Sequence, residues 1–491
     1  MTSPGPCQMA FAFADSPQGG KGEEPVDAST GAAFLLHTAK GNEAEGPGAS
    51  GDEPDGLLED VCSIRNLAIA LHNVARNKGA PGADGVSVKE VVANSHRLLP
   101  ALRRALLAGS YQPGDIRRVW IPKPGGGQRG LGIPNVVDRW VQQAVLQILE
   151  PIFEPHFHPS SHGFRPGRGA QTAIAEAKTH VAAGYDIVVD LDLSRFFDRV
   201  HHQRLLARLG ERVCDRRVLT LVRQMLKAQV VLPDGVRVST DEGTPQGGPL
   251  SPLLSNVVLD ELDWELERRG LRFVRYADDC NIFVRSERAG RRVMDATRRY
   301  IERKLRLVVN EEKSAVARPE ERHFLGFRLR HAADGTVEVH ISARTKDRLD
   351  TRIRELTPRT WGQSLESLFE TVNRYLRGWA GYFQLCTKEG ADLFARYDAH
   401  IRRRVRAIIV KHKGRRLRFL FRHLVERGVS PATAARVVRV KRGTWPTSHS
   451  AALHRAYPNA WFGERLLSLL GEWQRLNPAR TVSGQALLFD L

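Results

Sequence analysis

Cysteine is scarce in this sequence. The chain of 491 residues has five cysteines, and they lie far apart, at Cys7, Cys62, Cys214, Cys280 and Cys386. None belongs to a C-x-x-C pair, which argues against a zinc site, and their scatter argues against a disulfide framework. This pattern favours a reducing compartment, and we expect a cytoplasmic protein.

Long apolar runs are also missing. No stretch of about 18 consecutive apolar residues occurs, the length that suggests a membrane-spanning helix. The first residues show no basic segment followed by an apolar core, so no secretory signal is predicted. The sequence therefore predicts neither a membrane span nor a membrane partner.

Acidic residues are too few to balance the basic ones. The chain has 74 Lys and Arg against 55 Asp and Glu, a formal net charge of +19. An excess of this size favours a polyanionic partner, and nucleic acid is the commonest one. Part of it is concentrated in residues 402–442, which contain fifteen Lys and Arg and a single acid, Glu426. These cations cannot all pair with acids in the same segment, so phosphate is their expected counter-charge.

The N-terminal residues have the opposite character. Residues 1–55 are rich in Gly, Ser, Pro and acids and show no sustained periodicity. We predict a disordered acidic leader, because such a composition buries too little apolar surface to fold. From Leu57 apolar residues recur at three- and four-residue spacing, which predicts a helix as far as Gly79.

Two adjacent acids, Asp278 and Asp279, form the first candidate site. They lie between two runs rich in Phe, Val and Ile within residues 271–285, which predicts two strands and a tight hairpin turn. Asp is a common turn residue, so a purely structural turn is one interpretation. The other is a cation site, because adjacent carboxylates repel each other and gain little stability without a cation.

A second group of acids lies in the strand-like stretch 185–200. The alternating pattern places Asp186, Asp190 and Asp192 on one face of a strand. A carboxylate at the end of this strand, beside the Asp278–Asp279 turn, completes a metal cluster. Such oxygen ligands suit Mg²⁺, two ions of which can activate an attacking hydroxyl and stabilise a leaving group. Spacing favours Asp192 as the ligand, with Asp190 as the alternative.

Three further segments carry residues suited to nucleotides and nucleic acid. Lys123 and Arg129 flank a glycine run in a predicted two-stranded hairpin at residues 111–134, where they can hold triphosphate oxygens. Arg165 and Arg168 lie beside an aromatic residue in a loop that suits a strand of nucleic acid. Gln246 lies in a Gly- and Pro-rich loop at residues 243–253, where backbone can approach a substrate closely.

These segments together resemble a known family. In order, the chain carries IPKPGGGQRGLGIP, SSHGFRPGRGA, VVDLDLSRFFD, GTPQGGPLSPLLSN, YADD, LRLVVNEEKS and HFLGF. The series resembles the motifs of bacterial group II intron-encoded reverse transcriptases, often called maturases, from about Leu57 to about Phe462. The segments NRYLRGWAGYF and TWPTSHSAALHRAYPNAWF resemble the maturase-specific thumb region and the block after it.

The resemblance assigns roles to individual residues. It implies that Asp192, Asp278 and Asp279 bind the metal ions and that Lys313 protonates the leaving pyrophosphate, a sensible place for a general acid. Substrate contacts are implied for Lys123 and Arg129 at the triphosphate, Phe197 at the sugar, and Gln246 at the nucleotide or template. One departure is the sequence Arg129-Gly130-Leu131-Gly132, where the family usually has Arg-Pro-Leu-Gly.

The resemblance also implies a fold and a function. The expected fold is α+β: a right-hand polymerase with fingers and an antiparallel palm sheet, followed by an all-helical basic thumb. The expected parts are a leader (1–55), fingers and palm with an N-terminal extension (56–345), the thumb or maturase-specific domain (346–445) and a C-terminal segment (446–491). No pattern of an HNH endonuclease follows Phe462.

The implied reaction is RNA-templated addition of deoxynucleotides to a DNA primer, with assistance to intron splicing and mobility. One alternative is a relative detached from an intron that serves in defence or DNA repair. A second is a splicing cofactor that binds RNA without polymerising. A third, an RNA-dependent RNA polymerase, is disfavoured by Phe197 and Tyr276.

Overall fold

The computed structural model describes residues 56–478 except 123–125, 240–241, 361, 363, 415 and 441–442, with backbone alone for 388–390. The leader predicted for residues 1–55 and the predicted ligand Lys123 lie outside the described residues. The described residues form two compact units, residues 56–173 with Ile187–Val316 and Ile174–Asp186 with residues 317–478. The boundary predicted between palm and thumb, at residues 345 and 346, lies inside the second unit.

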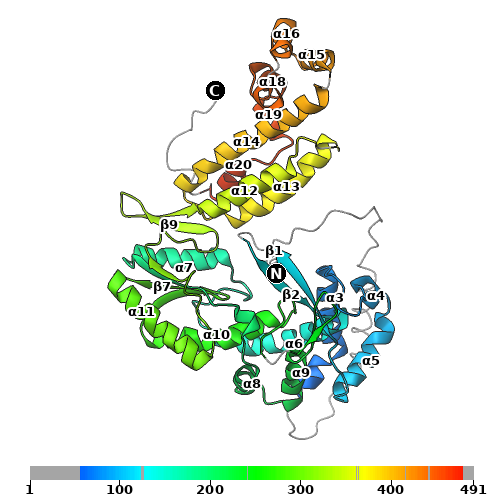
Figure 1. Cartoon of the computed structure of the whole chain (residues 1–491), viewed down its shortest axis with the longest axis vertical. Helices are drawn as coiled ribbons and strands as arrows, with labels where there is room; N and C mark the ends of the chain where they lie inside the picture. The colour runs from blue at the N-terminus through cyan, green and yellow to red at the C-terminus, as the bar shows by residue number, and fades with distance from the viewer. Residues whose placement is uncertain are drawn as a thin grey trace. The chain divides into compact units, whose positions relative to one another are not determined.

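The first unit begins with a group of short helices (Figure 1). They are α2 (Leu57–Val61), α3 (Ile64–Arg76), α4 (Val88–Ala93) and α5 (Ser95–Leu107). The single helix predicted after Leu57 is wrong in one respect, because it is divided at Cys62 and Ser63. Ser63 has an extended backbone and its side chain accepts a hydrogen bond from Asn66 N at 3.2 Å, so it caps α3 rather than continuing α2.

Helix α6 (Val136–Phe153) is the buried centre of this helical group. Trp140 is fully buried, and its Nε1 donates a hydrogen bond to the Leu67 carbonyl of α3 at 2.7 Å. A buried indole needs such a partner for its N–H. A short 3₁₀ turn, η1 (Glu154–His156), follows α6.

A four-stranded sheet forms the predicted fingers hairpin and its neighbours, in the order β2-β1-β4-β5. The strands are β1 (Ile116–Pro122), β2 (Gln128–Ile133), β4 (Val230–Val231) and β5 (Arg237–Val238). Strands β1 and β2 pair antiparallel, whereas β1 and β4 pair parallel. The two strands predicted within residues 111–134 are therefore confirmed.

The second sheet of this unit carries the candidate site, in the order β6-β7-β3-β8. Its strands are β3 (Ile187–Leu191), β6 (Arg272–Tyr276), β7 (Asp279–Val284) and β8 (Ala315–Ala317). The pairs β6/β7 and β7/β3 are antiparallel, as expected for a palm. The predicted acidic face of β3 is wrong, because Asp186 precedes the strand, Asp192 follows it, and Val188 on that face is buried.

Helices cover the palm sheet. Helix α11 packs on β3 and β7, and α10 packs on β6. The remaining elements of the unit are η2 (Phe196–Asp198), α8 (His202–Gly210), α9 (Arg216–Leu226), α10 (Ser251–Arg268), α11 (Glu287–Tyr300) and the π-helical turn η3 (Ile301–Leu305). Apolar side chains from these helices and from β3, β6 and β7 form one continuous core, which makes the palm a rigid base for the hairpin turn.

The second unit is mainly helical (Figure 1). It contains most of α7 (Ala170–Ala182) and the antiparallel hairpin of β9 (Phe327–His331) and β10 (Val337–Ile341). The segment Ile174–Asp186 belongs to this unit although it precedes much of the first in sequence. His331 Nε2 lies 2.8 Å from Asp186 Oδ1, a pair 145 residues apart in sequence.

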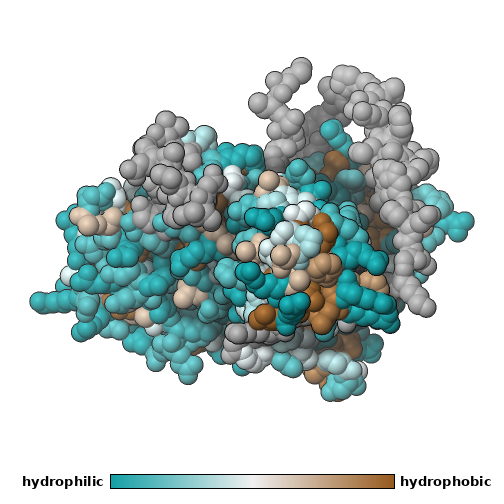
Figure 2. Space-filling model, turned by 90° about the horizontal axis from the view of Figure 1, so that it is seen from above, coloured by the Kyte–Doolittle hydropathy of each residue, from teal (hydrophilic) through white to brown (hydrophobic). Residues whose placement is uncertain are grey.

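Every regular element described after β10 is a helix. These are α12 (Ala343–Leu356), α13 (Leu365–Tyr382), α14 (Lys388–Lys413), α15 (Leu417–Glu426), α16 (Pro431–Arg439), α17 (Thr444–Thr447), α18 (Ala451–Ala456), α19 (Asn459–Gly463) and α20 (Leu469–Leu476). No helix in the described part of the chain combines the length and the apolar character needed to cross a membrane. Most of the surface visible in Figure 2 is hydrophilic.

Candidate active site

The turn between β6 and β7 consists of two residues, Ala277 and Asp278. Tyr276 and Asp279 form the last cross-strand pair, so Asp279 is the first residue of β7. Ala277 has a φ of 57°, in the left-handed region that favours glycine. A non-glycine residue there costs about 1–2 kcal/mol. The surrounding structure must therefore hold the turn in place.

Arg275 supplies much of this restraint from inside the protein. Its side chain is fully buried and pairs with the buried Asp263 of α10, with Nη2 and Oδ2 2.5 Å apart. Nη1 donates hydrogen bonds to the Ala277 carbonyl at 2.9 Å and to Asn256 Oδ1 at 3.0 Å. One planar guanidinium thus ties the turn to α10.

The loop at residues 160–163 packs directly against the same turn. His162 N donates to the Arg275 carbonyl at 2.9 Å, and Arg275 N donates to the Ser160 carbonyl at 2.9 Å. A Cβ added to Gly163 would lie 2.2 Å from Ala277 N. Glycine is therefore required at position 163 so that the two backbones can approach each other.

The acids at the turn perturb one another. Burial is the largest cause that raises the pKa of Asp279, to about 7, and nearby Asp278, Asp190 and Asp192 raise it further, while Lys313 lowers it. The side chain of Asp279 nevertheless reaches solvent. The pKa of Asp278 is also raised, first by burial and then by Asp192, although Arg129 and Arg275 act against the shift. These carboxylates lie close enough to repel one another when all are ionised.

Asp192 is brought to this group by the end of β3 and by the segment at residues 308–314. Asp192 N donates to Ser314 Oγ at 3.0 Å, and its carbonyl accepts from Asn310 N at 2.8 Å. The same segment places Lys313 Nζ 3.5 Å from Asp192 Oδ2. The structure thus brings together four residues that the sequence analysis selected, Asp192, Asp278, Asp279 and Lys313.

The acids at the turn form a donor set that suits Mg²⁺. Within the described residues, no three His, Cys, Asp or Glu side chains converge closely enough to form a ready-made metal cage. Mg²⁺ does not require such a cage, because it keeps several waters and takes one or two carboxylates directly. The mutual repulsion at Asp278 and Asp279 is the property that a cation relieves, so these residues fit the predicted ion.

The fingers hairpin meets the glycine-rich loop through two predicted substrate-binding residues. Arg129 Nε donates to Gln246 Oε1 at 2.8 Å, and Gly132 N donates to the Gln246 carbonyl at 2.9 Å. Arg129 also lowers the pKa of Asp278 through its charge, so it lies on the side of the acids. Two residues 117 positions apart in sequence thus form one polar group near the turn.

The structure explains why a glycine suits position 130, where the family usually has proline. Gly130 is paired with Trp120, and a Cβ at position 130 would lie 2.7 Å from Arg118 Nη1 and 3.1 Å from Trp120 Cζ3. Arg118 Nη1 also donates to the Gly130 carbonyl at 3.1 Å. Because neighbours along a strand point to opposite faces, Trp120 and Arg118 share one face and Arg129 lies on the other.

Phe197 packs edge-on against Phe196, with ring centroids 5.2 Å apart, and it is half-buried. Its carbonyl accepts a hydrogen bond from Thr244 N at 2.6 Å. Gly243 has a φ of 94°, and a Cβ there would lie 2.9 Å from the Phe197 carbonyl oxygen. Phe197 is therefore fixed beside the loop that carries Gln246, and its role toward the sugar stays a prediction.

The prediction that Arg165 contacts substrate is corrected by the structure. The residue is 5% exposed, and its guanidinium is 2.9 Å from Glu154 Oε1. Its Nη1 donates to the carbonyls of His158 and Ser161. Because its donors are used inside the protein, Arg165 shapes the loop at residues 158–165 instead of binding nucleic acid.

Arg275 is the functional residue that the sequence analysis missed. A signal was present, because an arginine among Phe273, Val274 and Ala277 interrupts an apolar strand. A charge in such a position needs a buried partner, but the sequence does not say that Asp263 supplies it.

Two protein-family models match the chain. Residues 121–329 match the family model described as "Reverse transcriptase (RNA-dependent DNA polymerase)". Residues 346–424 match the model "Group II intron, maturase-specific domain". The predicted fold class, a polymerase of fingers and palm followed by a helical region, is confirmed.

Relatives point to the same family. The chain is 36% identical over 314 residues to Protein YkfC of Escherichia coli (strain K12), which covers 56% of this chain and 82% of that protein. It is 28% identical over 336 residues to the group II intron-encoded protein LtrA of Lactococcus lactis subsp. cremoris, covering 55% and 56%. The chain thus spans only about half the length of LtrA.

Among solved structures, the chain is similar to part of a "Partial Cas6-RT-Cas1--Cas2 complex", with 22% identity over 53% of this chain and 46% of that one and a TM-score of 0.34. That score is too low to support an argument about this chain. The two family models and the match over most of YkfC are decisive: the chain belongs to the family of group II intron-encoded reverse transcriptases and maturases.

Proposed function

We propose that the chain adds deoxynucleotides to the 3′-end of a DNA primer, copying an RNA template, at the group formed by Asp192, Asp278 and Asp279. The observation that carries this proposal is the crowding of carboxylates at a strained turn, where burial first and then the neighbouring acids raise the pKa of Asp279 to about 7. A turn that served structure alone has no need for such repulsion, and the strain is offset by Arg275 and Gly163.

In the reaction, the primer 3′-oxygen forms a bond to the α-phosphorus, and the bond from that phosphorus to pyrophosphate breaks. Two Mg²⁺ ions, when bound by the three acids, would activate the hydroxyl and neutralise the charge on the leaving group. Arg129 suits the triphosphate because its guanidinium forms paired hydrogen bonds to phosphate oxygens. Gln246 orients Arg129 through the hydrogen bond described above.

Lys313 is proposed as the general acid. Its ammonium group lies 3.5 Å from Asp192, is 63% exposed, and can therefore turn toward an incoming nucleotide. Donation of its proton to the departing pyrophosphate oxygen stabilises the charge that develops there. Phe197 is proposed to exclude a 2′-hydroxyl and so to select deoxynucleotides.

The partners proposed are an RNA template, deoxynucleoside triphosphates, a DNA primer or target, and group II intron RNA whose splicing the chain assists. The basic residues of 402–442 supply counter-charge for phosphate. We also propose a cytoplasmic location, on the basis of the scattered cysteines, none of which belongs to a C-x-x-C pair.

Primer extension tests the proposal. The purified chain is incubated with an RNA template, a DNA primer, deoxynucleotides and Mg²⁺, beside the Asp278→Ala/Asp279→Ala variant and a control, Glu302→Gln, at an exposed acid of η3. We expect extension by the parent and by the control only. Absence of extension with RNA binding retained would favour the splicing cofactor. Sequencing of RNA that co-purifies with the chain separates an intron-bound role from an intron-free one.

A further inference from the structure

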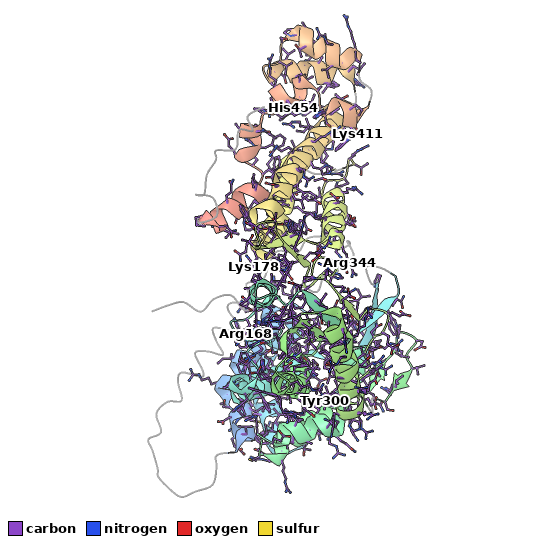
Figure 3. The ribbon with its side chains drawn as sticks, turned by 90° about the vertical axis from the view of Figure 1, so that its left-hand side faces the viewer. Arg168, Lys178, Tyr300, Arg344, Lys411 and His454 are labelled. Atoms are coloured by element: carbon purple, nitrogen blue, oxygen red, sulfur yellow. The ribbon has the colours of Figure 1, made fainter. Side chains whose placement is uncertain are left out.

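A pocket in the second unit is independent of the polymerase centre. It lies where α14 ends at Gly414 and α15 begins, an end of α14 marked by Lys411 in Figure 3. Its volume is about 430 Å³, and it is lined by His412, Lys413, Arg416, Phe419, Arg422, His423 and Glu426. Five of these seven residues come from α15 or its N-cap at three- and four-residue spacing, so they share one helix face.

The pocket is cationic, and its single carboxylate does not balance its positive charges. Lys413, Arg416 and Arg422 line it, against one carboxylate, Glu426. Among the residues that the structure describes, none of these three cations forms an ion pair with an acid. Anionic groups from outside are therefore favoured, and phosphate is the anion that a protein of this family meets.

The pocket also offers an uncovered aromatic ring. Phe419 is 43% exposed. The guanidinium carbons of Arg418 and Arg416 lie 5.1 and 5.9 Å from its centroid, farther than the 4.1 Å at which Arg403 lies over Trp445. An exposed ring bordered by cations has the properties of a stacking platform for a base.

The back of the pocket is fixed. His423 Nε2 lies 2.5 Å from the hydroxyl of Tyr457, which is buried. Burial lowers the pKa of His423, and the charges of Lys413 and Arg427 lower it further, so its ring is neutral at pH 7. The positive charge of the pocket at neutral pH therefore comes from the lysine and the arginines.

We propose that this pocket binds one unpaired nucleotide of a structured RNA, with its base on Phe419 and its phosphates beside Lys413, Arg416 and Arg422. The inference rests on the proposed binding of intron RNA and names the feature of that RNA which is recognised. The volume suits a small ligand, for which sites span about 300–1,000 Å³, and a base still paired in a helix cannot enter it. RNA presents such nucleotides in its loops and bulges, whereas duplex DNA keeps its bases stacked.

The test compares two RNA hairpins that differ by one bulged nucleotide, with duplex DNA as a third probe. Dissociation constants are measured by fluorescence anisotropy with the full chain and two variants. Phe419→Ala removes the platform, and Leu417→Ala is the matched control, because Leu417 is 49% exposed on the same helix outside the pocket. We expect Phe419→Ala to weaken binding of the bulged hairpin by about 5- to 100-fold, and Leu417→Ala to leave it unchanged.

A hairpin whose bulged nucleotide lacks its base separates the contribution of stacking to binding from the contribution of charge. Phe419→Ala should have no effect on this abasic probe, whereas Arg422→Gln should weaken its binding and Arg439→Gln, at an exposed arginine of α16, should not. Equal losses on bulged and paired hairpins, or equal losses on duplex DNA, overturn the proposal. Primer extension is measured separately with the same preparations. If the polymerase proposal fails, the RNA-binding result can therefore still be interpreted.

Discussion

Each compact unit holds a local cluster of like charges, and the two clusters have opposite signs. In the first, carboxylates converge on a turn, and the pKa of Asp279 rises to about 7 because of burial and three neighbouring acids. In the second, arginines converge, and the pKa of Arg406 falls to about 10 because of burial and the nearby Arg402. Each unit thus retains like charges that a protein selected for stability alone would separate. In the functions proposed above, a cation supplies the counter-charge in the first unit and phosphate supplies it in the second.

The largest expected effect comes from removing the charge of the first unit alone. We expect Asp278→Asn/Asp279→Asn to lower primer extension by about 10³-fold or more, because two of the carboxylates proposed to hold the Mg²⁺ ions are lost. Binding of RNA to the second unit should change less than twofold. Dissociation constants and extension rates of the same preparations check this, and a parallel loss of both would erase the distinction between the units.

The next largest expected effect concerns the interactions that hold the turn between β6 and β7 in place. Arg275→Met leaves Asp263 ionised in the protein interior without a partner, so we expect a loss of about 3–5 kcal/mol in the free energy of unfolding. Urea denaturation measures it. The double variant Arg275→Met/Asp263→Leu should recover most of the stability but not the extension rate, because the hydrogen bond to the Ala277 carbonyl is still missing. Recovery of full activity would show that Arg275 does not position the turn.

A matched substitution in the second unit should lower the free energy of unfolding by a smaller amount. Arg406 is also buried, and its Nη2 donates to the Tyr457 carbonyl at 2.7 Å, but no ion pair joins it to an acid among the described residues. Arg406→Met therefore leaves one unpaired carbonyl and no unpaired charge, for a loss of about 1–3 kcal/mol. Denaturation under the same conditions as for Arg275→Met compares the two, and a larger loss here would contradict the contrast.

The pH dependence of stability should expose the repulsion at Asp279. Its pKa in the folded chain, about 7, exceeds the ordinary Asp value of 3.8, so the folded state holds a proton that the unfolded state releases. Stability then falls as the pH rises from 4 to 7 and levels off above 7. Asp279→Asn should raise the melting temperature at pH 8 without Mg²⁺ by roughly 2–4 °C, because exposure to water moderates the repulsion.

The increase in melting temperature caused by Asp279→Asn should disappear near pH 4. Glu302→Gln serves as the control at both pH values, and Mg²⁺ should narrow the difference between the parent and Asp279→Asn. A gain in melting temperature that did not depend on pH would mean that charge is not its cause.

The smallest effect concerns the fingers. Gly130→Ala places a methyl group against Arg118 and Trp120, and the side chains must shift, at a cost of about 1 kcal/mol. Adding Trp120→Ala should remove most of that cost. Thermal melts of the two single variants and the double variant measure the coupling, and simple additivity would show that the indole does not restrict position 130.

Local patterns predicted the sheet of the candidate site well. Runs rich in Phe, Val and Ile on both sides of Asp278 and Asp279 predicted β6, β7 and the turn, because strand propensity and turn chemistry are local properties. The proximity of Asp192, Asp278, Asp279 and Lys313 was predicted only through the resemblance to a family, because nothing local joins residues so far apart in sequence.

Burial is what the sequence could not predict. Arg165 and Arg168 looked alike in a loop of glycine and proline, yet Arg165 is buried against Glu154. Arg275 was overlooked because its ion-pair partner, Asp263, lies on another element, α10. The fate of a charged side chain depends on its tertiary partner, and a single sequence does not identify that partner.

The interleaving of the two units has a consequence for synthesis of the chain. Asp186 pairs with His331, which follows 145 residues later. A ribosome adding about 5–20 residues per second delivers His331 roughly 7–30 s after Asp186. The segment Ile174–Asp186 therefore leaves the ribosome long before the rest of its own unit, while the residues that complete the palm are still being made. The first unit can close its core co-translationally, whereas the second must wait for the C-terminal half of the chain.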